Sequence, residues 1–252
     1  MKVSIITVCF NSASTISDTL DSVQSQSYGD IEHVIVDGGS SDGTVELLES
    51  RRANLGALIS EPDEGLYDAM NKGVLAATGD IIGVLNSDDI FESDDVVATV
   101  VDTFRESPDC DLVFGDVVFA EADDLSKVIR YYGAKHFRPW KLRFGWMPPH
   151  PATFVRRQAY DLAGPYRVDM KISADYEMFV RWLLKARLRW KYLSKVLVRM
   201  RSGGISTSGL RSSITLNREI VLACRENGIY TNLLMVLSKI PFKLAELVRR
   251  PG

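Results

Sequence analysis

Residues Val3–Cys9 read VSIITVC, a β-branched and apolar run that is followed by Phe10 and Asn11. Such a run is typical of a strand buried on both faces, as the strands of parallel sheets are. A helical segment follows over Ser14–Gln26, in which Ile16, Leu20 and Val23 fall on one face. Together they predict the first half of a βαβ unit and therefore an α/β fold.

The same alternation continues through the first 120 residues. Apolar runs predict further strands at Ile31–Asp37, Ala57–Ser60, Ile81–Leu85 and Asp111–Phe119. Apolar periodicity predicts helices from Thr44, over Leu66–Ala77 and over Asp94–Arg105. Strands that alternate with helices in this way are typical of a mostly parallel sheet flanked by helices.

The second half is less regular. Its expected elements are strands at Lys127–Tyr132, Ala152–Arg156 and Arg189–Met200, a helix at Ser173–Ala186 and a helical tail over Leu210–Arg250. A Gly/Ser-rich segment, Ser202–Gly209, precedes the tail. We therefore predict a main domain over residues 1–205, built from the halves 1–120 and 121–205, and a helical C-terminal extension over 206–252.

The formal net charge of −3 hides an uneven distribution. Residues 1–125 carry 5 basic and 26 acidic side chains, a balance of −21, whereas residues 126–252 carry 25 and 7, a balance of +18. This asymmetry indicates two surfaces with different partners. A nucleic-acid-binding protein does not usually devote half of its chain to carboxylates, so no nucleic-acid partner is expected.

Cysteine usage and hydropathy favour a cytoplasmic protein. Cys9, Cys110 and Cys224 are far apart and never spaced CxxC, which argues against a disulfide framework and a structural zinc site. The N-terminus lacks a signal-peptide pattern, and no stretch approaches the ~20 apolar residues that cross a bilayer.

Candidate ligand-binding residues follow three of the predicted strands: Phe10 and Asn11, then Asp37, then Asn86–Asp89. Ligands of open parallel sheets bind at this carboxyl edge. Any one of these residues alone is more simply a helix cap or an Asx turn. The adjacent carboxylates of Asp88 and Asp89, however, repel each other unless a cation lies beside them. Mg²⁺ or Mn²⁺ suits carboxylate oxygens and the phosphates of a substrate.

Glycine-rich phosphate loops are absent from the sequence. No GxGxxG follows the first strand, and GxxxxGK[ST] occurs nowhere. A nucleotide bound within this acidic half would need a metal ion to neutralise its diphosphate. The sequence therefore favours a metal-bridged nucleotide over a dinucleotide held by a helix terminus.

Four motifs, in this order, resemble those of family 2 inverting glycosyltransferases with the GT-A fold: Thr7–Asn11 (TVCFN), Val36–Thr44 (VDGGSSDGT), Asp63–Gly73 (DEGLYDAMNKG) and Leu85–Asp89 (LNSDD). The resemblance extends from Val3 to about Met200 and looks closest to bacterial enzymes of O-antigen, exopolysaccharide and glycolipid synthesis. It implies an α/β GT-A fold in which residues 1–120 bind the nucleotide sugar and residues 121–205 bind the acceptor.

The resemblance also implies a donor-binding set, whose members are Thr7, Phe10, Asn11, Asp37, Asp68, Lys72, Asn86 and Ser87. Phe10 and Asn11 would lie beside the base or ribose, and Asp37 would accept a hydrogen bond from uracil. Lys72 would approach the diphosphate. An ion pair between Lys72 and Asp68, one helical turn away, is an equally open alternative.

The resemblance places the metal at Asn86-Ser87-Asp88, where the family has an Asp-x-Asp motif. Asp88 and Asp89 would form the site of Mn²⁺ or Mg²⁺, with Asp88 as the metal ligand and Asp89 close to the donor sugar. Asn86 departs from the family pattern, because its amide replaces the first carboxylate. Some members supply a histidine ligand downstream of the base, and no histidine follows His150 here.

Inverting transfer needs a general base that takes the proton of the acceptor hydroxyl. The resemblance places this base in Ala174–Glu177 (ADYE), and we assign it to Asp175. The alternative is that Asp175 only stabilises the first turn of its helix, where the macrodipole would also lower the pKa of the carboxyl group. His150, in a proline-rich loop, is a candidate for the acceptor site or the metal shell, with an ordinary loop histidine as the alternative.

Aromatic and basic residues alternate in Phe137–Trp146 (FRPWKLRFGW). The segment fits an exposed loop, a sugar-stacking acceptor site or a patch that faces anionic lipid. The tail adds an amphipathic pattern, with apolar Leu233, Leu237, Ile240, Leu244 and Leu247 and basic Lys239, Lys243, Arg249 and Arg250. It predicts peripheral membrane contact or, alternatively, a helix packed on the domain or on a second subunit in a homodimer.

The sequence therefore predicts a metal-dependent inverting glycosyltransferase of cell-surface polysaccharide or glycolipid biosynthesis. Its donor would be a nucleotide sugar, most simply UDP-linked, and its acceptor a glycan or a polyprenyl-diphosphate-linked sugar at the inner face of the plasma membrane. One rival is another nucleotide enzyme, such as a nucleotidyltransferase or dehydrogenase. The other is a catalytically degenerate carbohydrate- or lipid-binding module, which Asn86 keeps open.

Overall fold

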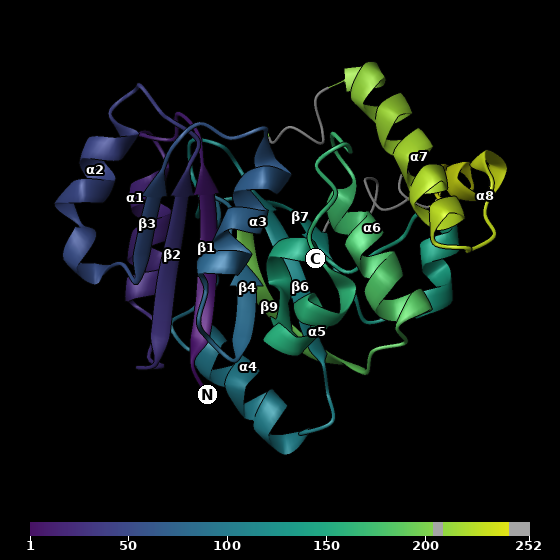
Figure 1. The fold of residues 1–252 in the computed structure, drawn as a ribbon, viewed down its shortest axis with the longest axis horizontal. Helices are drawn as coiled ribbons and strands as arrows, with labels where there is room; N and C mark the ends of the chain where they lie inside the picture. Colours follow the sequence, from purple (N-terminus) through teal and green to yellow (C-terminus); the bar gives the residue numbers. More distant parts are fainter. Residues whose placement is uncertain (204–208, 242–252) are drawn as a thin grey trace.

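The strands pair into one nine-stranded sheet in a computed structural model, which describes residues 1–203 and 209–241 (Figure 1). The strand order is β3-β2-β1-β4-β8-β6-β9-β5, and β7 pairs with β6. The strands are β1 (Val3–Cys9), β2 (Ile31–Asp37), β3 (Ala57–Ser60), β4 (Ile81–Val84), β5 (Ile90–Phe91), β6 (Leu112–Ala120), β7 (Val128–Tyr132), β8 (Thr153–Arg156) and β9 (Trp190–Arg201).

The first four strands, β1 to β4, confirm the predicted parallel sheet. β1 pairs in parallel with both β2 and β4, and β2 pairs in parallel with β3. The chain therefore runs outward from β1 to β3 and then crosses to the other side of β1 to form β4. In open α/β sheets a ligand crevice forms where the strand order reverses in this way, so the carboxyl ends of β1 and β4 are the expected site.

The second part of the sheet is mixed. β8 runs antiparallel to both β4 and β6, which separates these two strands, and β9 runs parallel to β6. Among the described strands and α-helices, one strand and one helix were not predicted. The strand β5 has only two residues, too few to show a period, and the helix α5 (Arg157–Ala163) follows β8 without a break.

Helices cover both faces of the sheet. The helices α3 (Leu66–Ala76), α5 and α6 (Ala174–Val180) pack on one face, and Figure 1 shows α3 and α5 in front of the strands. The helices α1 (Ile16–Gln24), α2 (Thr44–Ser50) and α4 (Val96–Glu106) pack on the other. Because side chains alternate along a strand, Val3 and Ile5 face α4 whereas Ile6 and Val8 face α3.

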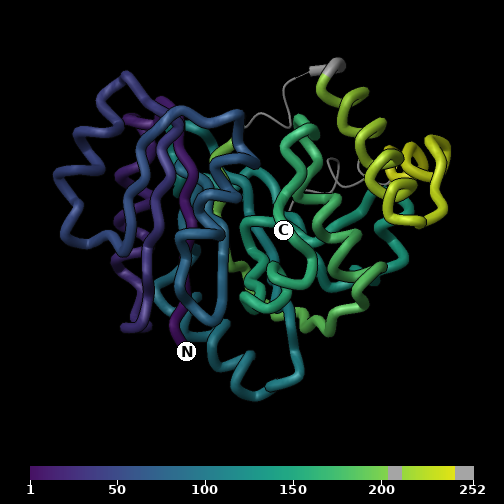
Figure 2. Tube along the Cα trace, viewed as in Figure 1, coloured from purple at the N-terminus to yellow at the C-terminus, as the bar shows by residue number. Residues whose placement is uncertain are grey.

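The tail is helical, as predicted, and its described part consists of two helices. α7 (Gly209–Glu226) ends before Gly228, whose φ of 74° is left-handed, and α8 (Leu233–Leu237) follows after a turn. The chain turns back there so that α8 lies against α7 (Figure 2). Ile220, Ala223 and Cys224 of α7 are buried in the same core as α6.

The boundary predicted at residues 205 and 206 and the residues Lys243, Leu244, Leu247, Arg249 and Arg250 lie outside the described ranges, so the domain division stays a prediction. Within residues 1–203 and 209–241, no helix combines the length and the apolar character needed to cross a bilayer.

Candidate functional site

The loops after β1 and β2 are joined by hydrogen bonds. The Asn11 N–H donates to Ser40 Oγ over 2.7 Å, and Asn11 Oδ1 accepts from the Ser41 N–H over 2.9 Å. Asn11 has a φ of 51°, a left-handed conformation that asparagine tolerates better than most residues. Its side chain therefore shapes the crevice, and a contact with base or ribose stays a prediction.

The loop after β3 reaches the same place because Gly38 has no side chain. A Cβ atom on Gly38 would clash with Asp63 Oδ2 and would lie 3.5 Å from Cδ2 of Phe10. Phe10 is 64% exposed, which leaves its ring free to contact a ligand. The Phe10 ring and the Asp63 carboxylate thus both lie against Gly38 at the sheet edge. Asp63 was not singled out from the sequence as a site residue.

The loop after β4 closes the other side of the crevice. The hydroxyls of Ser12 and Ser87 lie 2.9 Å apart and join the loops after β1 and β4. Thr19 of α1 donates its hydroxyl proton to the carbonyl oxygen of Asp89 over 2.8 Å. The structure therefore brings the loops after the four parallel strands together, as the position of the crossover predicts.

Asp37, at the end of β2, holds the loop after β2 in place through hydrogen bonds. It is completely buried, and Oδ2 accepts hydrogen bonds from Gly39 N, Ser40 N and Ser60 Oγ, while Oδ1 accepts from Ser40 Oγ. Burial raises the pKa of the Asp37 carboxyl group, but these donors outweigh it and hold the pKa below its ordinary value. Because Asp37 is buried and already accepts these hydrogen bonds, a contact with uracil stays a prediction that requires the loop to rearrange.

The structure contradicts the assignment of Thr7 to the donor site. Thr7 is fully buried on the α1 side of β1, and its hydroxyl lies 3.0 Å from His33 Nε2. Burial lowers the pKa of His33 to about 3, so the imidazole is neutral. Strand alternation explains the error, because Thr7 shares a face with Ile5 and Cys9 rather than pointing beyond the end of the strand.

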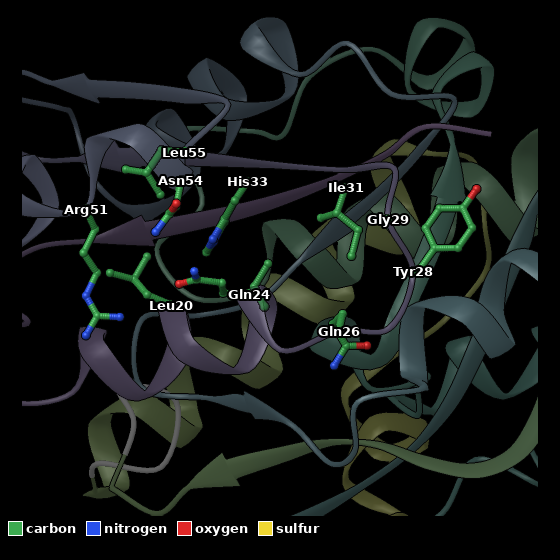
Figure 3. Close-up of a pocket in the computed structure, with 11 residues that line it drawn as sticks. Leu20, Gln24, Gln26, Tyr28, Gly29, Ile31, His33, Arg51, Asn54 and Leu55 are labelled. Carbon is green, nitrogen blue, oxygen red and sulfur yellow. The ribbon is translucent and has the colours of Figure 1, made fainter.

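A cavity of about 230 Å³ lies beside His33 (Figure 3). It is bounded by α1, by Ile31 and His33 near the start of β2, and by Arg51 and Asn54. This is the opposite end of β2 from Asp37, so the cavity is not part of the crevice.

Lys72 is held by acidic partners, as the alternative interpretation predicts. Its Nζ atom lies 2.9 Å from Glu61 Oε1 and 3.5 Å from Asp68 Oδ2, and it donates to the carbonyl oxygen of Pro62 over 3.0 Å. Hydrogen bonding to Glu61 raises the pKa of the Lys72 ammonium group. A contact between Lys72 and a diphosphate stays a prediction that requires a change of partner.

Asp89 is buried, and both of its carboxylate oxygens accept hydrogen bonds within the protein. It is 1% exposed, Oδ1 accepts from the Arg201 N–H over 3.1 Å, and Oδ2 accepts from Asn86 Nδ2 over 2.9 Å. Asn86 thus holds Asp89 in place. Burial first, and then the charge of Asp88, raises the pKa of Asp89 to about 8. A place for Asp89 in the metal site therefore stays a prediction that requires a change of hydrogen-bond partners.

Arg201 is a cation beside Asp88 and Asp89 that the sequence did not reveal. Its Nε donates to the carbonyl oxygen of Asp88 over 3.4 Å, and its guanidinium pairs with Asp18 over 2.7 Å. Its charge favours the ionised form of both aspartates. The repulsion from which a divalent cation was inferred is therefore partly relieved by the protein itself.

Asp88 nevertheless keeps a carboxylate that fits a metal ion. Its side chain is half-buried, and among residues 1–203 and 209–241 no other residue donates a hydrogen bond to it. Burial raises its pKa, which a cation would reverse. No group of three His, Cys, Asp or Glu side chains that could hold a metal ion occurs in these ranges.

The raised pKa of Asp89 predicts how stability depends on pH. Between the ordinary value of 3.8 and about 8, the folded protein binds this proton more tightly than the unfolded chain does, so the free energy of unfolding should fall as the pH rises. In urea unfolding without divalent metal, Asp89→Asn should remove up to about 1.4 kcal/mol per pH unit of this slope. Asp161→Asn, an exposed control, should keep it. Identical slopes for wild type and Asp89→Asn would contradict the assignment.

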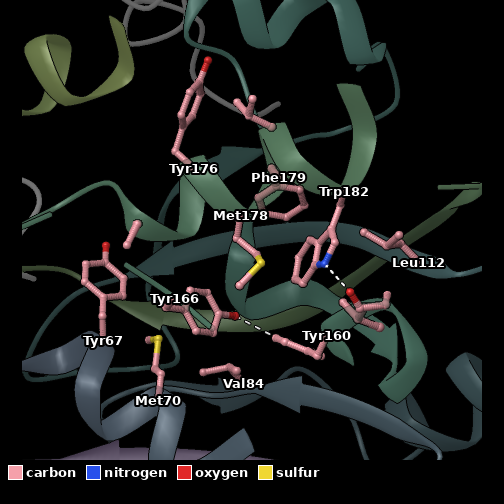
Figure 4. Packing of buried hydrophobic residues seen from close by; sticks show 14 of the residues in the cluster. Tyr67, Met70, Val84, Leu112, Tyr160, Tyr166, Tyr176, Met178, Phe179 and Trp182 are labelled. Atoms are coloured by element: carbon pink, nitrogen blue, oxygen red, sulfur yellow. Dashed lines mark hydrogen bonds between the residues drawn. The ribbon is translucent and has the colours of Figure 1, made fainter. Parts of the chain in front are cut away.

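His150 lies on the same sheet edge. β8 is antiparallel to β4, with Gly83 opposite Phe154, so the turn η3 (His150–Ala152) that precedes β8 lies beyond the carboxyl end of β4. His150 is 8% exposed, and its Nε2 lies 3.0 Å from the hydroxyl of Tyr166. The Tyr166 hydroxyl forms a second hydrogen bond, with the hydroxyl of Tyr160 at 3.0 Å (Figure 4).

The first turn of α6 places Asp175 near His150 and Tyr166. The Tyr67 hydroxyl donates to the carbonyl oxygen of Ile172 over 2.6 Å and to Asp175 Oδ1 over 3.3 Å. Tyr67 lies in the first turn of α3, and its ring stacks on that of Tyr166. Burial raises the pKa of Asp175, although His150 and the hydrogen bond from Tyr67 act in the opposite direction. The effect of burial on the pKa of Asp175 is thus larger than the lowering expected from the helix N-terminus.

Two side chains that the sequence did not indicate hold the segment before Asp175. Glu219 of α7 accepts hydrogen bonds from the backbone N–H groups of Lys171, Ile172 and Ser173 at 2.8–3.0 Å. Asn71 of α3 forms a pair of hydrogen bonds with the backbone of Tyr166 at 2.7 and 2.9 Å. No local pattern could identify these residues, because their partners lie far away along the chain.

Known proteins resemble this chain in sequence. The family model described as Glycosyl transferase family 2 matches residues 4–161, more than half of the chain. A protein of Mycobacterium bovis named PGL/p-HBAD biosynthesis glycosyltransferase is 34% identical over 209 residues, which are 81% of this chain and 79% of the relative. The poly-beta-1,6-N-acetyl-D-glucosamine synthase of Staphylococcus epidermidis is 29% identical over 45% of this chain and 28% of its own length.

Solved structures show the same fold. Staphylococcus aureus TarS 1-349 in complex with UDP-GlcNAc has a TM-score of 0.70 at 16% identity, over 97% of this chain and 73% of that one. The mannosyltransferase PcManGT of Pyrobaculum calidifontis in complex with GDP-Man and Mn²⁺ has a TM-score of 0.66 at 19% identity, over 98% and 73%. The predicted GT-A fold is confirmed, and with the match to the family model the chain belongs to glycosyl transferase family 2.

Proposed function

We propose that this enzyme transfers a sugar, with inversion, from a UDP-linked donor to a hydroxyl of a glycan or a polyprenyl-diphosphate-linked sugar. The transfer would serve cell-surface polysaccharide or glycolipid biosynthesis, which the names of the mycobacterial and staphylococcal relatives support. The observation that carries the proposal is Asp175, a half-buried carboxylate of raised pKa on the same sheet edge as Asp88.

In this proposal Asp175 is the general base. Its carboxylate takes the proton of the acceptor hydroxyl while that oxygen forms a bond to the anomeric carbon. The bond from this carbon to the diphosphate breaks on the opposite side, and UDP carries away the electron pair. A raised pKa suits the task, since a base is most effective when its pKa approaches the working pH. Tyr67 and Glu219 would hold the carboxylate and its helix in place.

Asp88 would hold Mn²⁺ or Mg²⁺ together with the diphosphate oxygens, and the ion would supply positive charge for the leaving group. Phe10 would lie against the base, and Asp63 beside it offers carboxylate oxygens at the same edge. Asp37 would act indirectly by fixing the loop after β2. His150 would line the acceptor side, beside Asp175, rather than the metal shell.

The test is a screen of UDP-sugars and GDP-mannose with Mn²⁺, Mg²⁺ or EDTA and a set of lipid-linked and free sugars. We expect nucleotide release that requires both a UDP-sugar and a divalent ion, and a product whose anomeric configuration by NMR is opposite to that of the donor. Nucleotide release in EDTA would contradict metal dependence, and retained configuration would contradict inversion. Binding of sugars without turnover of any donor would favour the binding module.

We also propose that the enzyme works in the cytoplasm at the inner face of the plasma membrane, where a polyprenyl-linked acceptor is accessible. The positive balance of residues 126–252 supports this location, because basic side chains are attracted to the anionic lipids of the inner leaflet.

A further inference from the structure

We propose that one surface of the second half docks on anionic phospholipid. The surface is defined by Arg138, Trp140, Lys141, Tyr230, Leu233 and Leu234, and we call it the aromatic-basic patch. This inference deepens the proposed function, since it names the surface by which the enzyme would meet a lipid-linked acceptor. Its test below uses neither donor nor acceptor, so it can fail while the proposed function holds.

The patch joins two segments that are distant in sequence. The turn η2 (Pro139–Phe144) and the segment around α8 are fastened by three hydrogen bonds to or from the backbone: Arg143 Nε to the Tyr230 carbonyl over 2.8 Å, Thr231 Oγ1 to the Arg143 carbonyl over 2.5 Å, and Lys239 Nζ to the Gly145 carbonyl over 3.1 Å. Val236 is completely buried on the inner side of α8. The two segments therefore form one fixed surface.

Large apolar side chains are exposed on this surface. Leu234 is 81% exposed, Tyr230 68%, Trp140 55% and Leu233 48%. Trp140 lies edge-on to Phe144 and near the Lys141 ammonium group. A monomeric protein rarely leaves such a cluster in water without a use for it. Tryptophan, tyrosine and leucine are the side chains that enter the boundary between headgroups and acyl chains.

The charge of the patch indicates an anionic partner. Residues 125–160 and 227–241 contain no aspartate or glutamate, whereas Lys135, Arg138, Lys141 and Arg143 lie in the first segment. Arg138 is exposed, and Lys141 and Arg143 are half-buried. Basic groups beside exposed leucines favour a lipid surface over a nucleic acid, because a leucine gains nothing from stacking on a base but gains free energy by entering the acyl region.

The patch is connected directly to the candidate base. The hydroxyl of Tyr176 donates a hydrogen bond to the carbonyl oxygen of Leu142 in η2, and Tyr176 directly follows Asp175. A membrane held by the patch would therefore lie near the helix that carries Asp175. An acceptor anchored in that membrane by its lipid could then reach Asp175 with its sugar.

The experiment measures co-sedimentation of the full chain with vesicles of phosphatidylcholine alone, or mixed with an equal amount of phosphatidylglycerol. We expect binding only to the mixed vesicles and weaker binding at high salt, which screens the attraction. Arg138→Gln with Lys141→Gln should lower the partition coefficient about 25-fold, that is about fivefold for each charge. Leu234→Ser should lower it about tenfold, since most of a leucine side chain would no longer enter the interface.

The matched controls are Arg52→Gln and Leu75→Ser, which change an exposed arginine and an 85% exposed leucine of the first half. They should bind as wild type does, and circular dichroism should show every variant folded. Equal binding to neutral vesicles, no binding to mixed vesicles, or patch variants that bind like the controls would overturn the proposal. So would a dimer that the patch variants dissociate while vesicle binding persists, because a second copy would then cover this surface.

Discussion

Asp175→Asn should lower the rate of sugar transfer about 10²–10⁴-fold, the usual cost of losing a general base. The amide keeps the size of the side chain and its acceptor oxygen for the Tyr67 hydroxyl, but it cannot take a proton from the acceptor hydroxyl. The loss should fall on kcat, measured by nucleotide release at saturating donor and acceptor, while the dissociation constant for UDP stays unchanged.

The pH profile separates this role from a structural one. In wild type, kcat should fall at low pH as Asp175 becomes protonated, and the raised pKa places this acid limb above the ordinary range of an aspartate. The limb should be absent from the residual activity of Asp175→Asn. Asp161→Asn, an exposed aspartate of α5, should retain both rate and profile. A folded Asp175→Asn protein with near wild-type kcat would show that another group is the base.

Asp88→Asn should lower transfer about 100-fold or more and raise the Mn²⁺ concentration needed for half-maximal rate. Loss of a residue that only supports a metal ligand already costs 10–100-fold, so loss of the ligand itself should cost at least as much. UDP binding measured by calorimetry should weaken in the presence of Mn²⁺ and stay the same in EDTA. A wild-type dependence on Mn²⁺ in Asp88→Asn would remove Asp88 from the metal site.

Asp89→Asn is the matched comparison for this variant, since it changes the adjacent carboxylate. Because Asp89 is buried between Asn86 and the backbone of Arg201, its loss should alter the pH dependence of unfolding and leave the Mn²⁺ concentration for half-maximal rate near that of wild type. Equal shifts in metal dependence for both variants would instead make the pair a joint site.

Most of the parallel half of the sheet could be predicted from the sequence. The β1, β2 and β3 bounds match the apolar runs, and the helices differ by a few residues at their ends. The local residue pattern is enough to predict these elements, because a strand buried on both faces must be apolar throughout. The second half was harder, since β8 lies between β4 and β6 and the pairing of distant strands leaves no local pattern.

The sequence by itself determined the family, the parallel frame and the polar residues at its carboxyl edge, because residue type and short spacing fix these features. Only the tertiary structure decided what each polar residue does. It buried Thr7 in the core, enclosed Asp89 between Asn86 and Arg201, and raised the pKa of Asp175 through burial. It also left the Asp88 carboxylate without a hydrogen bond from any other residue of the described ranges 1–203 and 209–241. Burial and long-range partners determine the charge and availability of a carboxylate, and both exist only once distant segments have packed together.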